Sequence, residues 1–191
     1  MTHRSWSLGI LISLGALMAA PLAGQSPAGY TRTLEAYAVP DLTLVNQDGQ
    51  RVKLKALLES GEPVVLDFIF GTCTTICPVL SAGFANFQAK MPPGPPKVRL
   101  VSISIDPEND TPKVMRDYLR RYRAKPGWDF LTGRREDIDQ VMRAFNAYIP
   151  NKMSHFPLTL IRDPKTGKWI RINGLMSSAE FVAECRKAGV L

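Results

Sequence analysis

Two continuous apolar runs interrupt the otherwise mixed pattern of hydrophobic and polar positions along the chain. Residues 63–70 read PVVLDFIF and residues 97–106 read KVRLVSISID, and breaks containing glycine and proline precede both runs. Apolar runs of this length without polar alternation are typical of strands that are buried on both faces of a sheet. The pattern therefore predicts two central strands.

Shorter apolar segments predict further strands. In residues 40–54, hydrophobic positions alternate on both sides of the turn signal Asp48-Gly49, which predicts a β-hairpin. The remaining strands are expected at WDFLTG (residues 128–133), at residues 157–163 and at residues 168–174, with turn residues joining the last two.

Helical periodicity and capping signals fill the gaps between the predicted strands. The predicted helices cover residues 79–91, a segment that begins with Thr111 as N-cap and Pro112 at the first helical position, residues 136–149, and a last helix that begins at Ser177 with Glu180 completing a capping box.

The resulting order of elements is hairpin, β, α, β, α, β, α, β, β, α. Strands that alternate with helices indicate an α/β sheet that is parallel in its centre, while the closing β-β-α is antiparallel. This is a thioredoxin-like topology with an N-terminal β-hairpin extension. We assign it to one domain over residues 38–191.

The first 26 residues have the pattern of an export signal. Arg4 precedes an apolar run over residues 8–20, and proline and small residues follow it. The run is shorter than the ~20 residues that a transmembrane helix needs, yet it has no clear A-x-A cleavage site. We therefore expect a periplasmic protein whose residues 1–26 are either a cleaved signal peptide or an N-terminal anchor. If they are an anchor, residues 8–23 would insert in the inner membrane. Residues 27–37 are expected to form a linker.

The chain carries a formal net charge of +7, and much of it lies in residues 113–125, where six of thirteen residues are basic and one is acidic. This segment is either a solvated helix face or a docking surface for an acidic partner protein or an anionic membrane. Nucleic acid is not an expected partner, since the chain is exported and carries no nucleic-acid-binding motif.

The candidate chemistry centres on FGTCTTICP, residues 70–78, which lies between the first central strand and the helix that follows it. We expect Cys73 and Cys77 in the first turn of that helix, where Thr74 and Thr75 can cap backbone N–H groups. A helix N-terminus favours thiolates, so this pair could form a redox-active disulfide or hold one soft metal ion.

A third ligand is available in His155, the only histidine outside the first 26 residues. It precedes the strand that starts at Pro157, in a loop that faces the cysteine motif in a thioredoxin-like fold, and the Phe156–Pro157 peptide bond is a candidate for the cis form. Two Cys and one His suit copper, as Cu(I) or as Cu(II). Zinc is the rival metal, although a structural zinc site usually has four protein ligands.

Four other residues are further candidates for the site. Met153 is a soft neighbour of His155 that could equally serve in packing. Asp106 and Asp110, in the stretch SIDPENDTP, follow a parallel strand at the edge where sites gather, but turn and cap chemistry explains them as well. Cys185 is expected to be a small core residue.

Taken in order, C-x-x-x-C-P after an apolar strand, then SIDPENDTP, then a histidine before a later strand resemble the Sco/SenC family. The resemblance covers roughly residues 38–191. It implies a thioredoxin fold, an extracytoplasmic and usually membrane-tethered location, and copper ligands at Cys73, Cys77 and His155. It also implies a role in assembling the copper centre of cytochrome c oxidase.

The leading hypothesis is a periplasmic metallochaperone that takes copper from a donor protein and passes it to a cuproprotein client, such as a cytochrome oxidase subunit. The alternative is a thiol–disulfide oxidoreductase that keeps target cysteines reduced, with Cys73 and Cys77 as its redox pair. A peroxide-reducing enzyme is a weaker reading, because no arginine can be placed for that chemistry.

Overall fold

The computed structural model of the chain describes Met1, residues 29–92, residue 94 and residues 97–190. The predicted signal peptide or anchor lies outside these residues apart from Met1, and it stays a prediction. Across the described ranges, the structure has no helix with the length and apolar character needed to cross a membrane.

The described chain folds into eight strands, five α-helices and one short 3₁₀ helix, η1. The strands are β1 (Tyr30–Glu35), β2 (Thr43–Asn46), β3 (Arg51–Lys53), β4 (Val64–Ile69), β5 (Arg99–Ser104), β6 (Trp128–Thr132), β7 (Leu158–Arg162) and β8 (Trp169–Gly174). The helices are α1 (Leu54–Leu58), α2 (Cys77–Lys90), α3 (Pro112–Arg121), α4 (Arg135–Ala144), η1 (Lys152–Ser154) and α5 (Ser178–Lys187).

All eight strands belong to one sheet in the order β1-β8-β7-β4-β5-β6-β2-β3. The centre is parallel, since β4 pairs with β5 and β5 with β6, whereas β7 lies antiparallel on the other side of β4. The predicted hairpin is confirmed as β2 and β3, and β2 attaches it to the edge of β6. The two apolar runs therefore form the central strands β4 and β5, as predicted.

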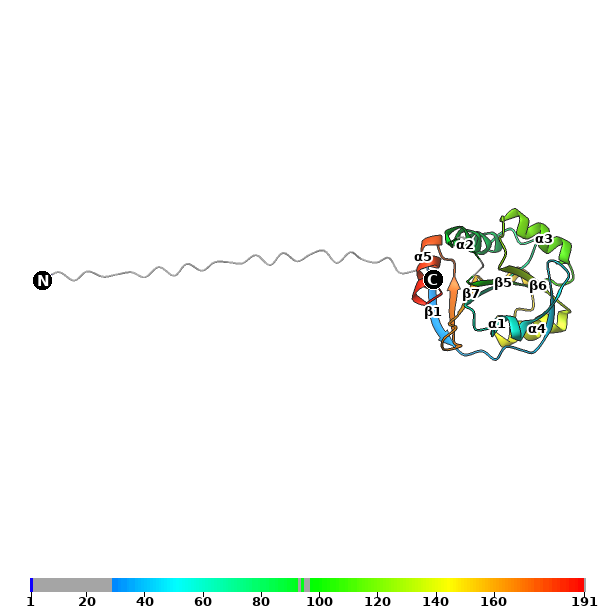
Figure 1. Cartoon of the computed structure of the whole chain (residues 1–191), viewed down its shortest axis with the longest axis horizontal. Coiled ribbons are helices and arrows are strands. Elements are labelled where there is room, and N and C mark those ends of the chain that lie inside the picture. Colours follow the sequence, from blue (N-terminus) through cyan, green and yellow to red (C-terminus); the bar gives the residue numbers. More distant parts are fainter. Residues whose placement is uncertain (2–28, 93, 95–96, 191) are drawn as a thin grey trace.

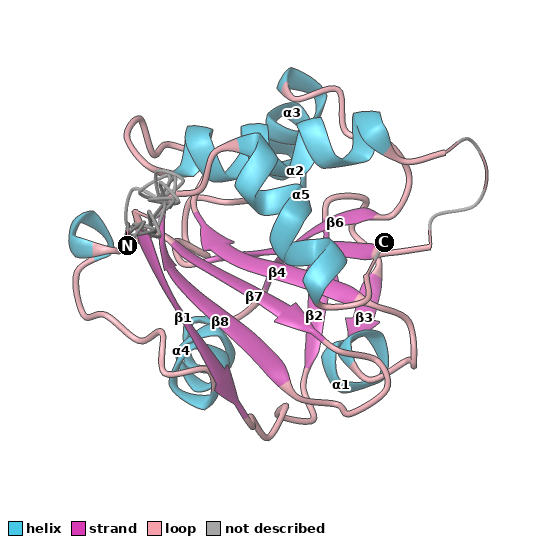
Figure 2. Cartoon of the chain, turned by 90° about the vertical axis from the view of Figure 1, so that its left-hand side faces the viewer, coloured by secondary structure: helices cyan, strands magenta, loops and turns pink. Residues whose placement is uncertain are grey.

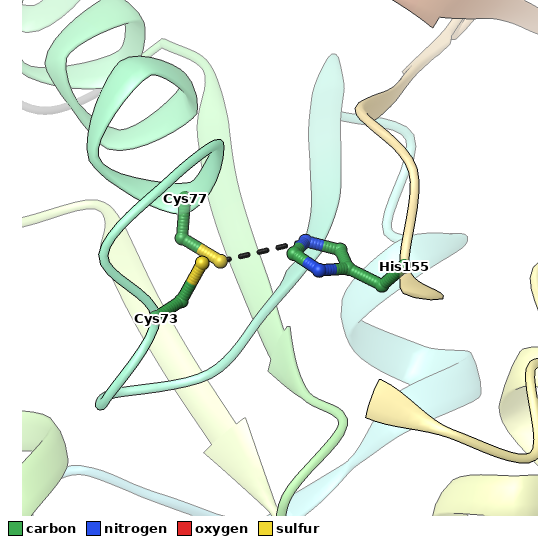
Figure 3. A group of neighbouring side chains, drawn as sticks. All are labelled: Cys73, Cys77 and His155. Carbon is green, nitrogen blue, oxygen red and sulfur yellow. Dashed lines mark hydrogen bonds between the residues drawn. The ribbon is translucent and has the colours of Figure 1, made fainter. Parts of the chain in front are cut away.

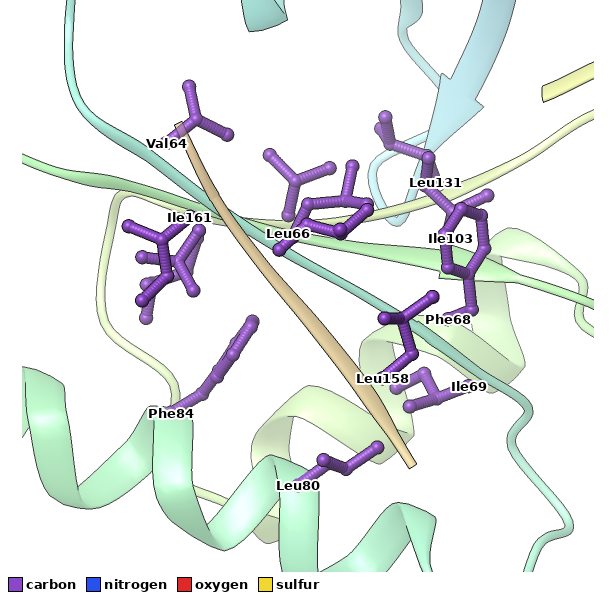
Figure 4. Close-up of a cluster of buried hydrophobic side chains, with 14 of the residues drawn as sticks. Val64, Leu66, Phe68, Ile69, Leu80, Phe84, Ile103, Leu131, Leu158 and Ile161 are labelled. Carbon is purple, nitrogen blue, oxygen red and sulfur yellow. The ribbon is translucent and has the colours of Figure 1, made fainter. Parts of the chain in front are cut away.

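Helices cover both faces of the sheet. Helices α2, α3 and α5 lie on one face, and α1 and α4 lie on the other (Figures 1 and 2). All six residues of β4 are buried, because both faces of this strand are covered. Figure 4 shows the core around β4, where Leu80 and Phe84 of α2 point toward the sheet. This arrangement fixes where α2 begins relative to the end of β4.

Besides the short 3₁₀ helix η1, two elements were not predicted. Residues 30–35, assigned to a linker in the sequence analysis, form the edge strand β1, which pairs with β8. Its long-range anchor is the buried Glu184 of α5, which accepts hydrogen bonds from the Tyr30 hydroxyl at 3.0 Å and from Arg32 Nε at 2.9 Å. The short helix α1 is the other omission, and it buries Leu54 and Leu58.

The central strand carries one polar anomaly. Asp67 of β4 is completely buried, and neither of its carboxylate oxygens has a hydrogen-bond partner among the described residues. Burial disfavours the charged form and raises the pKa of Asp67 to about 7. Between the ordinary Asp pKa of about 4 and about pH 7, the folded chain holds a proton that the unfolded chain has already released.

We expect the free energy of unfolding to fall as pH rises from about 4 to about 7, by roughly 1 kcal/mol per pH unit from Asp67 alone. The sign follows because ionisation costs free energy only in the folded state. Denaturant unfolding of the wild type and of Asp67→Asn, followed over this pH range, measures the contribution. The exposed Asp41→Asn is the matched control, and parallel curves for wild type and Asp67→Asn would contradict the assignment.

Candidate metal centre

The cysteine motif occupies the loop between β4 and α2 and the first residue of that helix. Helix α2 begins at Cys77, and Pro78 follows within its first turn. Cys73 lies in the preceding loop, where its backbone N–H donates to the Phe70 carbonyl at 3.2 Å. The pair therefore straddles the helix start.

This placement corrects two expectations. Cys73 is not in the first helical turn, and neither Thr74 nor Thr75 caps the helix, because the N-cap residue is Ile76 and it makes no side-chain cap. Pro78 explains the difference. Proline has no N–H and is tolerated only in the first turn, so a helix that started at Cys73 would place it in the interior.

His155 approaches from the opposite side of the site. It follows η1 and precedes β7, and its Nε2 atom lies 3.4 Å from Cys77 Sγ. The ligand atoms of Cys73, Cys77 and His155 all lie within 4.8 Å of one another, and Figure 3 shows the three side chains converging. The ring of the buried Phe70 meets the imidazole edge-on, with 5.5 Å between centroids, and supports its orientation.

The two thiols have different environments. Cys77 is buried and Cys73 half-buried, and all three cysteines of the chain are free thiols. Burial raises the pKa of Cys77 well above its usual range, and the hydrogen bond with Cys73 raises it further. Burial also raises the pKa of Cys73, but hydrogen bonds with Cys77 and Thr75 outweigh it, so that this pKa is lowered. Cys73 is thus the thiol that more readily becomes a thiolate.

Burial lowers the pKa of His155, which favours the neutral imidazole that a metal ligand requires. Two sulfur atoms and one imidazole nitrogen form a soft donor set that suits Cu(I). In the described part of the chain, this cluster has three members and gains no fourth Cys, His, Asp or Glu, whereas a structural zinc site would normally have four ligands. The donor set therefore fits copper better than zinc, and the paired thiols could also form a disulfide.

Asp110 holds the loop that carries Cys73. This buried carboxylate accepts from the Gly71 backbone N–H at 3.0 and 3.1 Å and from the Ser104 hydroxyl at 2.5 Å. A side chain at Gly71 would bring a Cβ atom to 2.7 Å from Asp110 Oδ1, so glycine is required for this close approach. Asp110 is thus a positioning residue, outside the ligand cluster.

Asp106 holds the other side of the site. Its carboxylate accepts from Asn109 Nδ2 and forms an ion pair of 2.5 Å with Lys152, the first residue of η1. Lys152 stands three residues before His155, so this pair fixes the turn that presents the imidazole. The stretch SIDPENDTP therefore combines the predicted turn chemistry with contacts to both ligand-bearing loops.

Sequence reasoning missed three supporting residues, namely Phe70, Gly71 and Lys152. The signal available for Gly71 was a glycine directly after an apolar strand, which often marks a close backbone approach. Lys152 carried no local signal, since its partner Asp106 is 46 positions away.

The remaining candidates are settled by burial and backbone geometry. Cys185 is fully buried in α5, as predicted, whereas Met153 is 74% exposed and does not pack in the core. The expectation of a cis bond before Pro157 is wrong, since no described peptide bond is cis. The trans form costs less for an X-Pro bond, and here the Pro157 carbonyl accepts from Gly174 N–H at 2.9 Å as β7 begins.

The SCO1/SenC family model matches residues 31–188. The SCO1 protein homolog of Bacillus subtilis is 39% identical over 116 residues, which are 59% of this chain and 59% of the relative. The match thus spans less than two thirds of that relative's length.

Solved structures show the same fold. BsSco, described as a member of the Sco family of cytochrome c oxidase assembly proteins with a disulfide switch, aligns with a TM-score of 0.66 and 32% identity over 82% of this chain and 95% of that one. Arabidopsis thaliana ScoI, solved with copper bound, aligns with a TM-score of 0.63 and 25% identity over 78% of this chain and 96% of its own. The thioredoxin-like fold prediction is confirmed.

Proposed function

Because the chain belongs to the SCO1/SenC family, we propose that it binds copper through Cys73, Cys77 and His155 and delivers it to a cuproprotein, such as a subunit of cytochrome c oxidase. The observation that carries the proposal is the convergence of two sulfur atoms and one imidazole nitrogen within 4.8 Å of one another. The copper-bound structure of Arabidopsis thaliana ScoI supports copper as the metal.

Three protein ligands leave a coordination position open for an incoming ligand. Copper could then leave by exchange, with a partner thiolate entering as a ligand of this protein departs. Cys73 is the ligand expected to depart first, because it is half-buried in a loop, whereas Cys77 is buried at the start of α2. The site thus combines one firmly held sulfur with one that an acceptor can reach.

The second candidate function is thiol–disulfide exchange at the same cysteines. Two observations favour it: the pKa values of the two thiols shift in opposite directions, and BsSco is described as containing a disulfide switch. In this function the half-buried Cys73, as a thiolate, attacks a target disulfide to form a mixed disulfide and releases the other target sulfur as a thiolate. The second thiol then attacks the Cys73 sulfur and releases the reduced target, leaving a disulfide between Cys73 and Cys77.

For the cellular location we propose the periplasm, with the apolar run of residues 8–23 serving as a signal or as an anchor in the inner membrane. The support is the sequence pattern of residues 1–26, with a basic start, an apolar run and small residues after it. Protease accessibility in intact and osmotically opened cells would test this location.

One experiment separates the two functions. The Cu(I)-loaded chain is mixed without oxygen with the copper-free, reduced copper domain of an oxidase subunit, and copper in the acceptor is measured. We expect transfer from the wild type and little from His155→Ala. In a parallel reaction, the copper-free, reduced chain is mixed with the same oxidase domain, whose own cysteines have been oxidised to a disulfide. Reduction that needs both cysteines and survives His155→Ala, without any copper transfer, would favour the oxidoreductase.

A further inference from the structure

Large apolar side chains are exposed beside the metal ligands. Val79, two residues after Cys77, is 44% exposed, and Met153 and Phe156, on either side of His155, are 74% and 37% exposed. Single exposed apolar side chains are common on protein surfaces, and it is their grouping beside one site that is informative. These three residues therefore place apolar surface on both the cysteine side and the histidine side of the site.

A fourth exposed apolar residue extends this surface. The Gly174 backbone N–H donates to the Pro157 carbonyl at 2.9 Å, which brings Leu175, at 38% exposure, next to the Phe156–Pro157 segment. We call Val79, Met153, Phe156 and Leu175 the apolar rim. Among the described residues, only Met1 and Leu34 are other large apolar side chains with comparable exposure. Gathered exposure of this kind, unlike scattered exposure, marks an interaction site.

Two arginines flank the apolar rim without a carboxylate partner in the part of the chain that the structure describes. On the cysteine side, Arg121 Nη2 lies 3.5 Å from the Gly71 carbonyl, two residues before Cys73. On the histidine side, the guanidinium of Arg171 lies 5.9 Å from the Phe156 ring and donates to backbone carbonyls. Arg171 also donates to the Tyr37 hydroxyl and to Asn173 Oδ1, so its N–H groups already have acceptors, whereas Arg121 is exposed.

The acidic groups near the site are already engaged. Asp106 and Asp110 are buried in the contacts that hold the two loops. Glu108 is paired with Arg135, and Glu180 accepts from the backbone N–H of Ser177 in its capping box. Of these groups, Asp106 and Glu108 are neutralised by Lys152 and Arg135, whereas Asp110 is buried and Glu180 keeps its charge near Leu175. Beside the Cys73 loop, Arg121 is the exposed charged group that reaches the site.

The basic segment of residues 113–125 contains both arginines and lysines with carboxylate partners and one arginine that reaches the site. Lys113 and Arg120 pair with Asp117, and Arg116 lies 3.8 Å from Asp48, so these residues form a solvated helix face. Arg121 is the member of the segment that reaches the cysteine loop.

We propose that the apolar rim, with Arg121 and Arg171, is the docking face for an acidic protein partner that carries an acceptor thiol. The partner's apolar surface would cover the rim, its carboxylates would pair with Arg121 and lie near Arg171, and its thiol would then lie next to Cys73. An apolar centre with a polar edge is the usual anatomy of a protein interface, and arginine is enriched there. The thiol acceptor rests on the proposed copper transfer, whereas docking can be measured without copper.

An anionic membrane offers the same combination of charge and apolar contact. A protein partner is favoured because Val79, Met153 and Phe156 flank Cys77 and His155 along the chain, and a lipid surface has no thiol that could receive copper from these ligands. Binding to vesicles is therefore an outcome of the test, and it would count against the proposal.

The test uses two fluorescent peptides of equal length with the same apolar residues and with serine in place of cysteine, one flanked by Glu and the other by Lys. Binding to the copper-free full chain is measured by anisotropy at about 0.01 M and about 1 M salt, where the screening length falls from about 30 Å to about 3 Å. We expect about tenfold tighter binding of the Glu peptide at low salt and a ratio near one at high salt.

Variants locate the docking face. Arg121→Glu is expected to remove most of the preference for the Glu peptide, whereas Arg186→Glu, an exposed arginine at the far end of α5, keeps it. Met153→Ser is expected to weaken binding of both peptides several-fold, whereas Leu34→Ser, exposed on β1, has no effect. Equal affinity for both peptides overturns the proposal, as does binding of vesicles with anionic lipid that Arg121→Glu and Met153→Ser abolish.

A second measurement distinguishes failure of the docking face from failure of the proposed copper function. The same peptides with their cysteines restored are mixed with the Cu(I)-loaded chain, and the rate of copper transfer is followed. Preferential binding of the Glu peptide without any copper transfer would refute the copper function and leave the docking face intact. Transfer at equal rates to both peptides would refute the docking face and leave the copper function intact.

Discussion

Replacement of Cys77 by serine is expected to lower the Cu(I) affinity of the chain on the order of 10³-fold, well beyond the 10–100-fold that loss of a supporting residue costs. A serine hydroxyl is a hard donor that stays protonated near neutral pH, so it cannot replace a thiolate on a soft ion. Cys77 is the buried ligand at the start of α2, and its sulfur is 3.4 Å from His155 Nε2, so its loss leaves Cys73 and His155 without their common neighbour.

Anaerobic competition against a coloured Cu(I) chelator measures this affinity. Cys185→Ser is the matched control, because it makes the same change at a buried thiol of α5 outside the ligand cluster. Circular dichroism of both variants shows whether the fold survives. Wild-type affinity in a folded Cys77→Ser chain would eliminate this residue as a ligand.

Replacement of Asp110 by alanine is expected to weaken Cu(I) binding by about 10–100-fold although Asp110 lies outside the ligand cluster. Without the carboxylate, the Gly71 N–H and the Ser104 hydroxyl lose their acceptor, and the loop that presents Cys73 loses its hold on the β5–α3 segment. Each buried polar group left unsatisfied costs about 1–3 kcal/mol, so the free energy of unfolding should also fall by about 2–4 kcal/mol.

Asp117→Ala is the matched control for this substitution. Asp117 pairs with Lys113 and Arg120 on the surface of α3, and such exposed ion pairs contribute little to stability. Chelator competition and denaturant unfolding are measured on both variants. Unchanged copper affinity in Asp110→Ala would show that the Cys73 loop keeps its geometry without this anchor.

The sequence predicted the parts of the fold that local patterns determine. The apolar runs located β4 and β5, Asp48-Gly49 located the hairpin, and the caps Thr111 and Ser177 placed the starts of α3 and α5 correctly. The local pattern also placed the cysteine pair at the junction of β4 and α2, because the motif lies between the predicted strand and the predicted helix.

The rest depended on contacts between distant residues. β1 forms because Glu184 binds Tyr30 and Arg32, more than 150 positions away, and its mixed polar sequence gives no strand signal strong enough to oppose a linker. Likewise, the roles of Asp106 and Asp110 became clear only when Lys152 and Gly71 were found beside them. Local sequence propensities contain no information about such long-range contacts.

The site itself was predictable to the level of which residues converge. What the sequence could not supply was the difference in burial between the thiols, since Cys77 is buried by contacts with distant residues such as His155, whereas Cys73 stays half-buried in the loop. The charge pattern was likewise ambiguous until Arg121 was found at the Gly71 carbonyl.

X-ray absorption at the copper edge of the anaerobically Cu(I)-loaded chain, measured beside His155→Ala, tests the central claim most directly. We predict two sulfur ligands and one nitrogen ligand per copper in the wild type, one copper per chain, and loss of the nitrogen ligand in His155→Ala. The same spectrum from both proteins, or a copper held by sulfur alone in the wild type, would contradict the three-ligand site.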